Sequence, residues 1–292
     1  MQLKARSRAL VGLIALVALV AVTGCTVPRP PGDSPLRYRD QVFSGVGTSR
    51  DIPYGQAPDA QGNPVTLRLD LYAPNGDERV DRPALVWVHG GGFTTGDKSS
   101  GRARATYFAR LGYVAVSINY RLLSPDGCGG NPNPTPVCQN AALEAQHDAQ
   151  AAVRWLRANA ATYKIDTNRI AMGGASAGAV TSVLAATHSE DPGTSGNPGH
   201  PSDIRAAVSV SGGMPTNQLI DAGDSPTLFI HGTEDRVVPY AWAVQNAAAM
   251  HNLGILTVLE PIEGAGHGLP ADYGQLINEQ SSWFLWWAMG LG

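Results

Sequence analysis

The stretch IAMGGASAG, residues 170–178, decides which fold this chain adopts. An apolar run typical of a buried strand leads directly into a glycine-rich turn around Ser176, and a helical segment follows over Ala177–Thr187. A strand, a sharp turn and a helix in this order are typical of the turn that presents a nucleophilic serine at the edge of a sheet. Such a turn needs very small residues two positions before and two after the serine, where Gly174 and Gly178 stand. The alternative is a glycine-rich turn that only joins a strand to a helix.

Apolar runs of strand length alternate with helical segments on both sides of this stretch. The apolar runs cover residues 65–72, 84–88, 113–118, 170–173, 206–210, 228–230 and 256–259. The helical segments cover residues 141–161, 177–187, 241–253 and 272–289. Continuous apolar runs suit strands that are buried on both faces of a parallel sheet. The alternation therefore predicts an α/β fold with a mostly parallel central sheet, helices on both faces, and a ligand site at the carboxyl ends of the strands.

Size and charge narrow the class of protein. The 292 residues fit one large α/β domain better than two ordinary ones, because such folds often exceed about 200 residues as a single unit. The formal net charge is −3, and only 15% of the residues are charged, against about 25% in a typical soluble protein. Since the chain has no long basic or acidic run, nucleic acid is not an expected partner.

The first residues resemble a bacterial lipoprotein signal. Basic residues precede the apolar stretch Ala9–Val22, which is too short for a comfortable membrane span of about 20 residues. The stretch runs into Val22-Thr23-Gly24-Cys25, and small residues just before a single cysteine resemble a lipobox. On that resemblance, residues 1–24 are a signal peptide, and a lipidated Cys25 anchors the exported protein to the bacterial cell membrane. The alternative is an ordinary secretory signal, which also exports the chain.

Residues 25–41 are rich in proline and poor in apolar side chains, which predicts an extended tether before a domain over residues 42–292. If Cys25 carries lipid, Cys128 and Cys138 remain as a pair. An exported protein meets an oxidising compartment, so a disulfide between these two cysteines is expected. Two buried free thiols are the alternative. No metal site is expected, because the pair lacks the spacing and the neighbouring histidines of a zinc site.

A second glycine motif, His89-Gly90-Gly91-Gly92-Phe93, follows the apolar run at 84–88. Successive glycines allow backbone conformations that aim several N–H groups at one point. Together with the N–H of the residue after a nucleophilic serine, such groups form an oxyanion hole. In this chain the donors would be Gly91, Gly92 and Ala177. The alternative is a glycine turn that serves packing only.

A nucleophilic serine needs a general base, and the base needs an acid that orients it. In folds of this type the chain order is serine, then acid, then histidine. His267 lies beyond the last predicted strand among small residues, and Asp235 follows the run at 228–230. We therefore expect His267 and Asp235 to act with Ser176. His231 stands where the acid should come, so we expect it to pack or to form a hydrogen bond. Weaker alternatives for the acid are Glu234, Asp224, Glu260 and Glu263.

Taken together, these segments resemble the carboxylesterase and hormone-sensitive-lipase-like branch of the α/β-hydrolases, from about Ile52 to the C-terminus. The matching pieces are HGGGF (89–93), NYRL (119–122), DAQAAVRWLRANAATYKID (148–166), GGASAG (173–178), HGTEDRVVP (231–239) and GAGH (264–267). The resemblance implies the α/β-hydrolase fold and a serine esterase that works through an acyl-serine intermediate, with no metal or organic cofactor. The substrate would be an ester, either a small molecule or borne on a polymer. Many relatives carry Asp or Glu where this chain has Ala175, which weakens the assignment to the hormone-sensitive-lipase subgroup.

The same features leave three other functions open. An acyltransferase would use the same three residues but exclude water. A serine peptidase is a second alternative, because HGTEDRVVP also resembles prolyl-oligopeptidase-type and dienelactone-hydrolase-like enzymes, although the chain lacks room for an accessory propeller. A non-catalytic binding protein on this fold is the third, and such proteins usually have a damaged set of catalytic residues.

Two segments bear on access to the site. Only residues 211–227 separate two of the predicted strands, and this stretch is too short for the helical cap of many relatives, so we expect a minimal cap and an open site. Residues 123–139 follow a strand and therefore lie at the same edge of the sheet. A Cys128–Cys138 bridge would stiffen this loop beside the pocket. The alternative is a stapled surface loop remote from the substrate.

Overall fold

The computed structural model describes residues 26–122, 128 and 133–292, and within them the chain forms an eight-stranded sheet. The strands are β1 (Val46–Pro58), β2 (Pro64–Pro74), β3 (Arg82–Val88), β4 (Val114–Ile118), β5 (Ile165–Ala175), β6 (Ala206–Val210), β7 (Thr227–Gly232) and β8 (Thr257–Ile262). Their order across the sheet is β1-β2-β4-β3-β5-β6-β7-β8. β2 pairs antiparallel with both of its neighbours, and all later pairs are parallel. The prediction of a mostly parallel sheet is confirmed.

The helices of the described residues lie between these strands and after them. They are the 3-10 turn η1 (Lys98–Gly101) and the α-helices α1 (Arg102–Leu111), α2 (Pro136–Ala158), α3 (Ala160–Tyr163), α4 (Ala177–Thr187), α5 (Tyr240–Asn252), α6 (Leu269–Asp272) and α7 (Gly274–Met289). α4 has the predicted bounds. α2 begins earlier than predicted, because Thr135 caps it by accepting the N–H of Cys138 and Pro136 opens its first turn.

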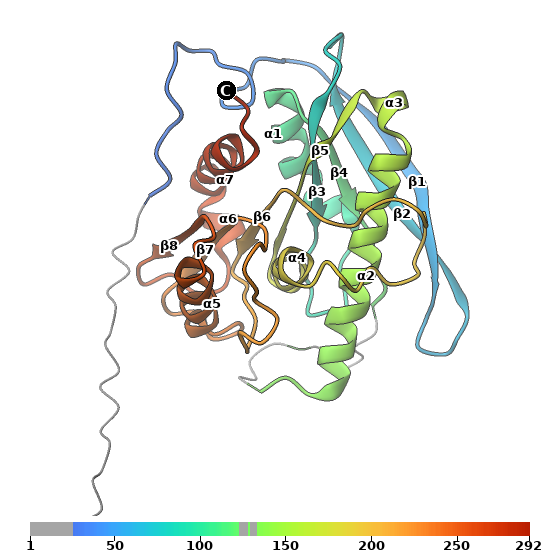
Figure 1. Ribbon diagram of the computed structural model, residues 1–292, viewed down its shortest axis with the longest axis vertical. Helices are drawn as coiled ribbons and strands as arrows, with labels where there is room; N and C mark the ends of the chain where they lie inside the picture. Colours follow the sequence, from blue (N-terminus) through green and yellow to red (C-terminus); the bar gives the residue numbers. More distant parts are fainter. Residues whose placement is uncertain (1–25, 123–127, 129–132) are drawn as a thin grey trace, which may run out of the picture.

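β1 and α1 were not predicted from the sequence. β1 is an edge strand whose residues are mostly exposed or half-buried, so it shows no clear apolar pattern. It pairs with β2 in a long hairpin at one side of the molecule, drawn in blue and cyan in Figure 1. α1 has the sequence RARATYFARL, and its buried residues Ala105, Phe108 and Ala109 have helical spacing within a segment that carries three arginines. For β1, packing against its neighbour supplies what the local pattern lacks.

Helices cover both faces of the sheet, as predicted. Successive side chains of a strand point to opposite faces, and β3 shows the result. Leu85 and Trp87 belong to the core that α1 and α7 complete, whereas Val86 and Val88 belong to the core that α2 and α4 complete. α5 packs on the same side as α4, over Phe229 of β7.

Residues 26–41, for which the sequence predicts an extended tether, run past α7 toward α1 (Figure 1). Val27 is buried, and its N–H donates to Gln280 Oε1 of α7 at 2.9 Å. Trp287 Nε1 donates to the carbonyl oxygen of Pro28 at 2.9 Å. This segment therefore contacts the domain through buried side chains and hydrogen bonds. Cys25 and the predicted signal peptide lie outside the described residues.

Two further expectations concern the connections. Residues 211–226, all of which the structure describes, join β6 to β7 without a helix, as expected for a minimal cap. Cys128 and Cys138 form the expected disulfide, with their Cα atoms 5.5 Å apart. The other residues between 123 and 132 lie outside the described part of the chain. Among the described residues, no helix combines the length and the apolar character that crossing a membrane requires.

Candidate active site

Ser176 stands at the turn between β5 and α4 in a backbone conformation that most residues avoid. Its φ is 55° and its ψ is −120°, a strained combination. The glycines of the turn let neighbouring backbones approach closely. A Cβ on Gly178 would lie 2.1 Å from the carbonyl oxygen of Val88, and a Cβ on Gly174 would lie 2.3 Å from the backbone of Gly178. The predicted sharp turn is therefore present, and it holds Ser176 at the carboxyl end of β5.

The structure brings Ser176, His267 and Asp235 together. His267 Nε2 lies 2.8 Å from Ser176 Oγ, and His267 Nδ1 lies 2.8 Å from Asp235 Oδ2. Asp235 follows β7 and His267 follows β8, so all three side chains come from the carboxyl ends of strands. Each distance is within the range of a hydrogen bond. The imidazole thus bridges the hydroxyl and the carboxylate in the geometry that general-base activation of a serine requires.

The environment of Asp235 keeps its carboxylate charged. Its side chain is fully buried, and burial alone would raise the pKa of the carboxyl. Hydrogen bonds from His231, from His267 and from the N–H groups of Val237 and Val238 outweigh burial and hold the pKa of Asp235 well below its usual range. A buried, charged Asp235 fixes the orientation of the His267 ring and stabilises the imidazolium that forms when the ring takes a proton.

His231 is a second histidine on the same carboxylate. Its ring is fully buried, and its Nε2 lies 3.1 Å from Asp235 Oδ2 and 3.0 Å from the carbonyl oxygen of Val238. Both neighbours are acceptors, so Nε2 carries the proton. The sequence predicts a packing or hydrogen-bonding role for His231, and the structure identifies Asp235 as its partner. The spacing of four residues in HGTED was the only signal of this contact.

The glycine motif follows β3, which is next to β5 in the sheet. Asp235 follows β7, on the other side of β5, so the glycines and Asp235 flank Ser176 from opposite sides. Gly91, Gly92 and Ala177 all line the cleft that contains Ser176 and His267. Gly91 has a φ of 116°, and a Cβ there would lie 2.0 Å from the carbonyl oxygen of Thr95, so this position requires glycine. Ala177 is the first residue of α4, and its N–H therefore has no acceptor within the helix. The three residues expected to supply the donors thus line the same cleft as Ser176, and their role as an oxyanion hole stays a prediction.

Tyr120 packs against the glycine loop, residues 89–93. Its ring stacks on that of His89 with 4.3 Å between the centroids, and its hydroxyl donates to the carbonyl oxygen of His89 at 3.1 Å. Phe93 packs edge-on against the same tyrosine at 6.2 Å. Both ends of the motif 89–93 therefore rest on one buried aromatic side chain. Tyr120 belongs to the NYRL piece, whose contact with this loop was not predicted.

A cleft of about 800 Å³ opens around these residues. Its walls come from the glycine loop, the start of α2, one side of α4, the connection after β6 and the start of α5. Cys128 and Cys138 form part of the wall. Cys128, Pro134 and Cys138 therefore lie beside the pocket, whereas residues 129–132 of the same loop lie outside the described part of the chain.

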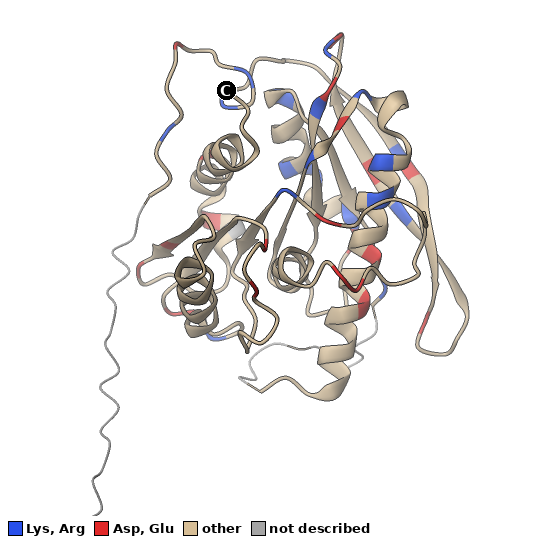
Figure 2. Ribbon diagram, viewed as in Figure 1, with Lys and Arg blue, Asp and Glu red and all other residues tan. Residues whose placement is uncertain are grey.

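Most of the cleft wall is uncharged. Neither α4 nor α5 contains Lys, Arg, Asp or Glu, and both helices are free of coloured residues in Figure 2. The two helices contribute Val180, Leu184 and Trp242 to the wall. Apolar walls exclude water and strengthen electrostatic interactions between the reacting groups.

Two of the four weaker candidates for the acid, Asp224 and Glu263, form other contacts. Asp224 precedes β7 and accepts the N–H of Asp221 at 2.8 Å, and Glu263 pairs with the hydroxyl of Thr233 at 3.4 Å. His267 Nδ1 is instead occupied by Asp235. The expected chain order of serine, acid and histidine therefore pointed to Asp235, the residue that contacts His267.

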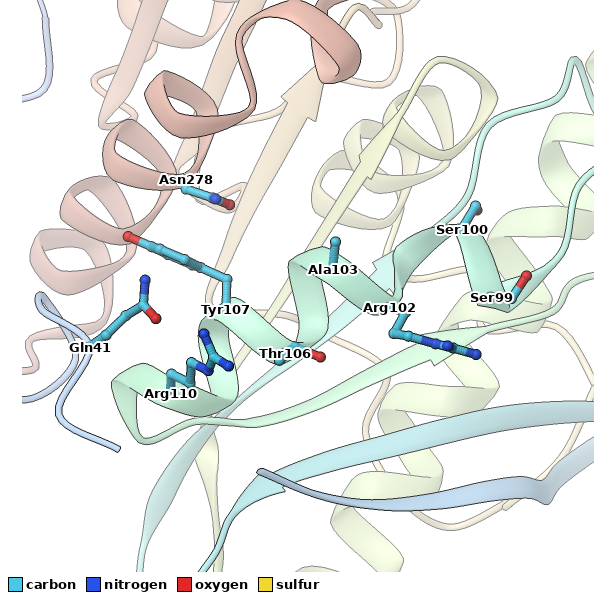
Figure 3. Close-up of a pocket in the computed structure, with 9 residues that line it drawn as sticks. All are labelled: Gln41, Ser99, Ser100, Arg102, Ala103, Thr106, Tyr107, Arg110 and Asn278. Atoms are coloured by element: carbon cyan, nitrogen blue, oxygen red, sulfur yellow. The ribbon is translucent and has the colours of Figure 1, made fainter. Parts of the chain in front are cut away.

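A second hollow, of about 680 Å³, lies on the other face of the sheet between α1 and α7 (Figure 3). Figure 3 shows Tyr107 extending from α1 toward α7. The hollow is lined by Gln41, Ser99, Ser100, Arg102, Ala103, Thr106, Tyr107, Arg110 and Asn278. These lining residues include no histidine, and the carboxylate beside Ser99 is that of Asp97, which caps η1 by accepting the N–H of Ser99 at 2.7 Å. An arrangement of serine, histidine and aspartate like that at Ser176 is absent from the residues that line this hollow.

Comparisons with known proteins agree with this geometry. The family model named BD-FAE matches residues 69–214, which is half of the chain, and a second model described as TAP-like protein matches residues 205–286. Phenmedipham hydrolase of Pseudarthrobacter oxydans is 34% identical over 168 residues, which cover 56% of this chain and 29% of that protein. A probable carboxylic ester hydrolase, LipM of Mycobacterium tuberculosis, is 34% identical over 164 residues, which cover 54% of this chain and 32% of that protein. The aligned region thus spans about a third of the length of these curated relatives.

Among solved structures, esterase 2 of Thermogutta terrifontis phosphorylated by paraoxon is 26% identical with a TM-score of 0.62, and the match covers 86% of this chain and 94% of that one. A carbohydrate esterase from gut microbiota is 20% identical with a TM-score of 0.64, covering 86% of this chain and 98% of that one. The likeness to this second esterase shows the fold alone.

Proposed function

Since this chain belongs to the BD-FAE family of α/β-hydrolases, we propose that it hydrolyses carboxylic esters through an acyl-serine intermediate. The observation that carries the proposal is the position of His267, whose two ring nitrogens lie 2.8 Å from Ser176 Oγ and 2.8 Å from Asp235 Oδ2. The esterase named in the paraoxon complex and the ester hydrolases among the relatives support the same chemistry.

In the first half-reaction, His267 Nε2 takes the proton of Ser176 Oγ while that oxygen attacks the ester carbonyl carbon. The carbonyl oxygen becomes an oxyanion, which the N–H groups of Gly91, Gly92 and Ala177 stabilise. One such donor is worth a factor of about 10²–10³ in rate. The C–O bond to the alcohol then breaks, and His267 gives its proton to the departing alkoxide. The acyl group remains bound to Ser176.

In the second half-reaction, water replaces the alcohol. His267 Nε2 takes a proton from the water as its oxygen attacks the acyl carbon, and the same N–H groups hold the second oxyanion. Collapse of this intermediate returns the proton to Ser176 Oγ and releases the carboxylic acid. Asp235 stays ionised throughout, in keeping with its depressed pKa.

Labelling and substitution test this proposal directly. A fluorophosphonate probe should label the full chain, and peptide mapping should find the adduct on Ser176. Ser176→Ala should abolish both labelling and turnover of p-nitrophenyl acetate, whereas Ser100→Ala, at an exposed serine outside the cleft, should keep both. Full turnover by Ser176→Ala would refute the assignment. Transfer of the acyl group to an added alcohol in preference to water would identify an acyltransferase instead.

We also propose that the protein is exported and anchored by lipid at Cys25, and the lipobox-like VTGC at residues 22–25 supports this. Metabolic labelling with an alkyne fatty acid should mark the wild-type chain in a bacterial host and leave Cys25→Ala unmarked. Labelling of the Cys25→Ala variant would contradict the anchor. Export without any labelling of the wild-type chain would indicate an ordinary secretory signal.

A further inference from the structure

One stripe of α4 forms the floor of the cleft beyond the catalytic residues. All residues of α4 are buried except Val180 and Leu184. These two line the cleft together with Ala177 at the start of the helix and His188 just after its end. The four positions are three or four residues apart, so they share one face of the helix. The cleft therefore continues along α4 away from the nucleophile.

The length of this stripe is set by the helix itself. From Ser176 to His188 the chain advances twelve residues, which corresponds to about 18 Å at the rise of an α-helix. Apart from the catalytic residues, most other lining residues are apolar too, and Gln139, Thr216 and Gln218 are the polar exceptions. Ala142 and Leu143 line the cleft from α2, and Met214 and Leu219 line it from the connection after β6. We call this part of the cleft, which runs over Val180 and Leu184 to His188, the groove along α4.

The far end of the groove is polar. His188 Nδ1 lies 2.6 Å from Glu190 Oε1, and the backbone carbonyl of His188 accepts a hydrogen bond from Gln146 Nε2 at 2.7 Å. The side chain of Glu190 is 69% exposed, so solvent begins there. An apolar chain that reached His188 would gain nothing by extending farther, because the next groups are hydrated.

The two parts of an ester occupy different parts of this cleft. The alcohol oxygen must leave beside His267, which gives it a proton. Val237, Val238 and Trp242 line the cleft near the segments that carry Asp235 and begin α5. The acyl carbon is attached to Ser176 Oγ, at the position where the α4 stripe begins. The alcohol side therefore faces α5, and the groove is left for the acyl chain.

We propose that the groove along α4 binds a long unbranched aliphatic acyl chain, with Leu184 as the residue that determines how far the chain penetrates. The preferred substrate class is thus an ester of a long-chain fatty acid. This proposal rests on the ester hydrolysis proposed above and adds to it the identity of the acyl group. Three features favour an extended acyl chain over a compact acyl group. α4 has no charged residue, its residues Ala177, Val180 and Leu184 form one continuous face of the cleft, and the hydrated end of the groove lies at His188.

The test is a series of p-nitrophenyl esters from acetate through butyrate, octanoate and laurate to palmitate, measured with the full chain below the solubility limit of each ester. Burial of one methylene group is worth about a fourfold gain in affinity. We expect kcat/KM of the wild-type chain to rise by up to this factor for each methylene and to level off once the chain reaches His188. A value of kcat/KM that is flat or falls with length would overturn the proposal.

Leu184→Trp fills the groove, and we expect it to lower the ratio of kcat/KM for laurate to that for butyrate at least tenfold. Leu184→Gln, which makes the same position polar without filling it, should lower the ratio in the same direction and covers the case in which the tryptophan variant does not fold. The matched control is Leu253→Trp, at a leucine that is 44% exposed and lies outside the cleft lining. An unchanged ratio in both folded Leu184 variants would overturn the proposal.

A second series varies the alcohol, from ethyl to decyl acetate. If the length dependence appears on the alcohol side and Leu184→Gln removes it there, the assignment of the groove to the acyl chain is wrong. These outcomes are separable from failure of the proposed function. An esterase without acyl-length preference still turns over p-nitrophenyl acetate through Ser176, whereas a chain that is no esterase turns over no ester in either series.

Discussion

Replacing Asp235 with asparagine changes one oxygen of the side chain into an amide nitrogen at a site where four donors meet. Oδ1 accepts the N–H groups of Val237 at 2.8 Å and Val238 at 3.0 Å. Oδ2 lies 2.8 Å from His267 Nδ1 and 3.1 Å from His231 Nε2. A carboxylate accepts on both oxygens, but an amide has one acceptor and one donor group. The amide oxygen of Asp235→Asn will stay with one pair of donors, and its NH₂ group will face the other pair.

If the NH₂ group faces the histidines, the His267 ring must turn an unprotonated Nδ1 toward it. The ring proton then sits on Nε2, which faces Ser176 Oγ and can no longer accept the serine proton. In a serine protease the same change lowers kcat about 10⁴-fold, which corresponds to about 5 kcal/mol of transition-state stabilisation. We expect a loss of this size here, because the contacts of Asp235 leave the amide no orientation that satisfies all four donors.

The assay is kcat for p-nitrophenyl butyrate at neutral pH, with a thermal melt of the same sample. Asp203→Asn is the matched control, since Asp203 is exposed and pairs with Arg157 at 3.3 Å outside the cleft. The control should retain wild-type kcat. A folded Asp235→Asn variant whose kcat stays within tenfold of wild type would refute the role of Asp235 and the reasoning about the ring proton.

Three groups outside the catalytic residues have measurable effects of their own: the Tyr120 hydroxyl, the disulfide and the Asp224 carboxyl. Tyr120→Phe removes the hydroxyl that donates to the buried carbonyl oxygen of His89. Since a buried acceptor left unpaired costs about 1–3 kcal/mol, we expect the free energy of unfolding in urea to fall by about this amount. An unaltered free energy of unfolding would contradict this. The double variant Cys128→Ser, Cys138→Ser removes the disulfide, which joins two residues at a sequence separation of 10. The free energy of unfolding in urea should therefore drop by about 3 kcal/mol. An unchanged urea midpoint of unfolding would contradict this prediction. Burial raises the pKa of the Asp224 carboxyl from 3.8 to about 6. Between these two pH values the folded chain keeps the proton that the unfolded chain has lost, so the free energy of unfolding falls as pH rises. Thermal melts of Asp224→Asn across this pH range should lack that decline, and an identical decline in the variant would show that another group causes it.

Much of the candidate site could be predicted from the sequence because its residues sit in turns with a local signature. Ser176 is flanked by glycines that the close approach of Val88 requires. Asp235 and His267 follow apolar runs that became β7 and β8, and parallel strands bring their carboxyl ends to one edge. The chain order of acid and base then selected one pair among several rivals.

Other features had no local signature. β1 lies at the edge of the sheet and is mostly exposed or half-buried, so its own residues show little periodicity. The contact of His231 with Asp235 depends on how the turn after β7 folds back. The position of the disulfide in the cleft wall depends on where α2 crosses α4. Nothing in the sequence around Leu184 distinguishes a groove from an ordinary buried helix.

The sequence by itself determined the α/β alternation, the strained turn at Ser176 and the identity of the residues that meet there, because each of these depends on short-range sterics and on the order of segments along the chain. Only the tertiary structure decided which side of α4 faces the cleft, where the disulfide stands, and how far the apolar wall extends beyond the nucleophile. These features arise from contacts between segments that are far apart in the chain. Their geometry is set by how helices pack across the sheet, which the pattern of a single segment does not encode.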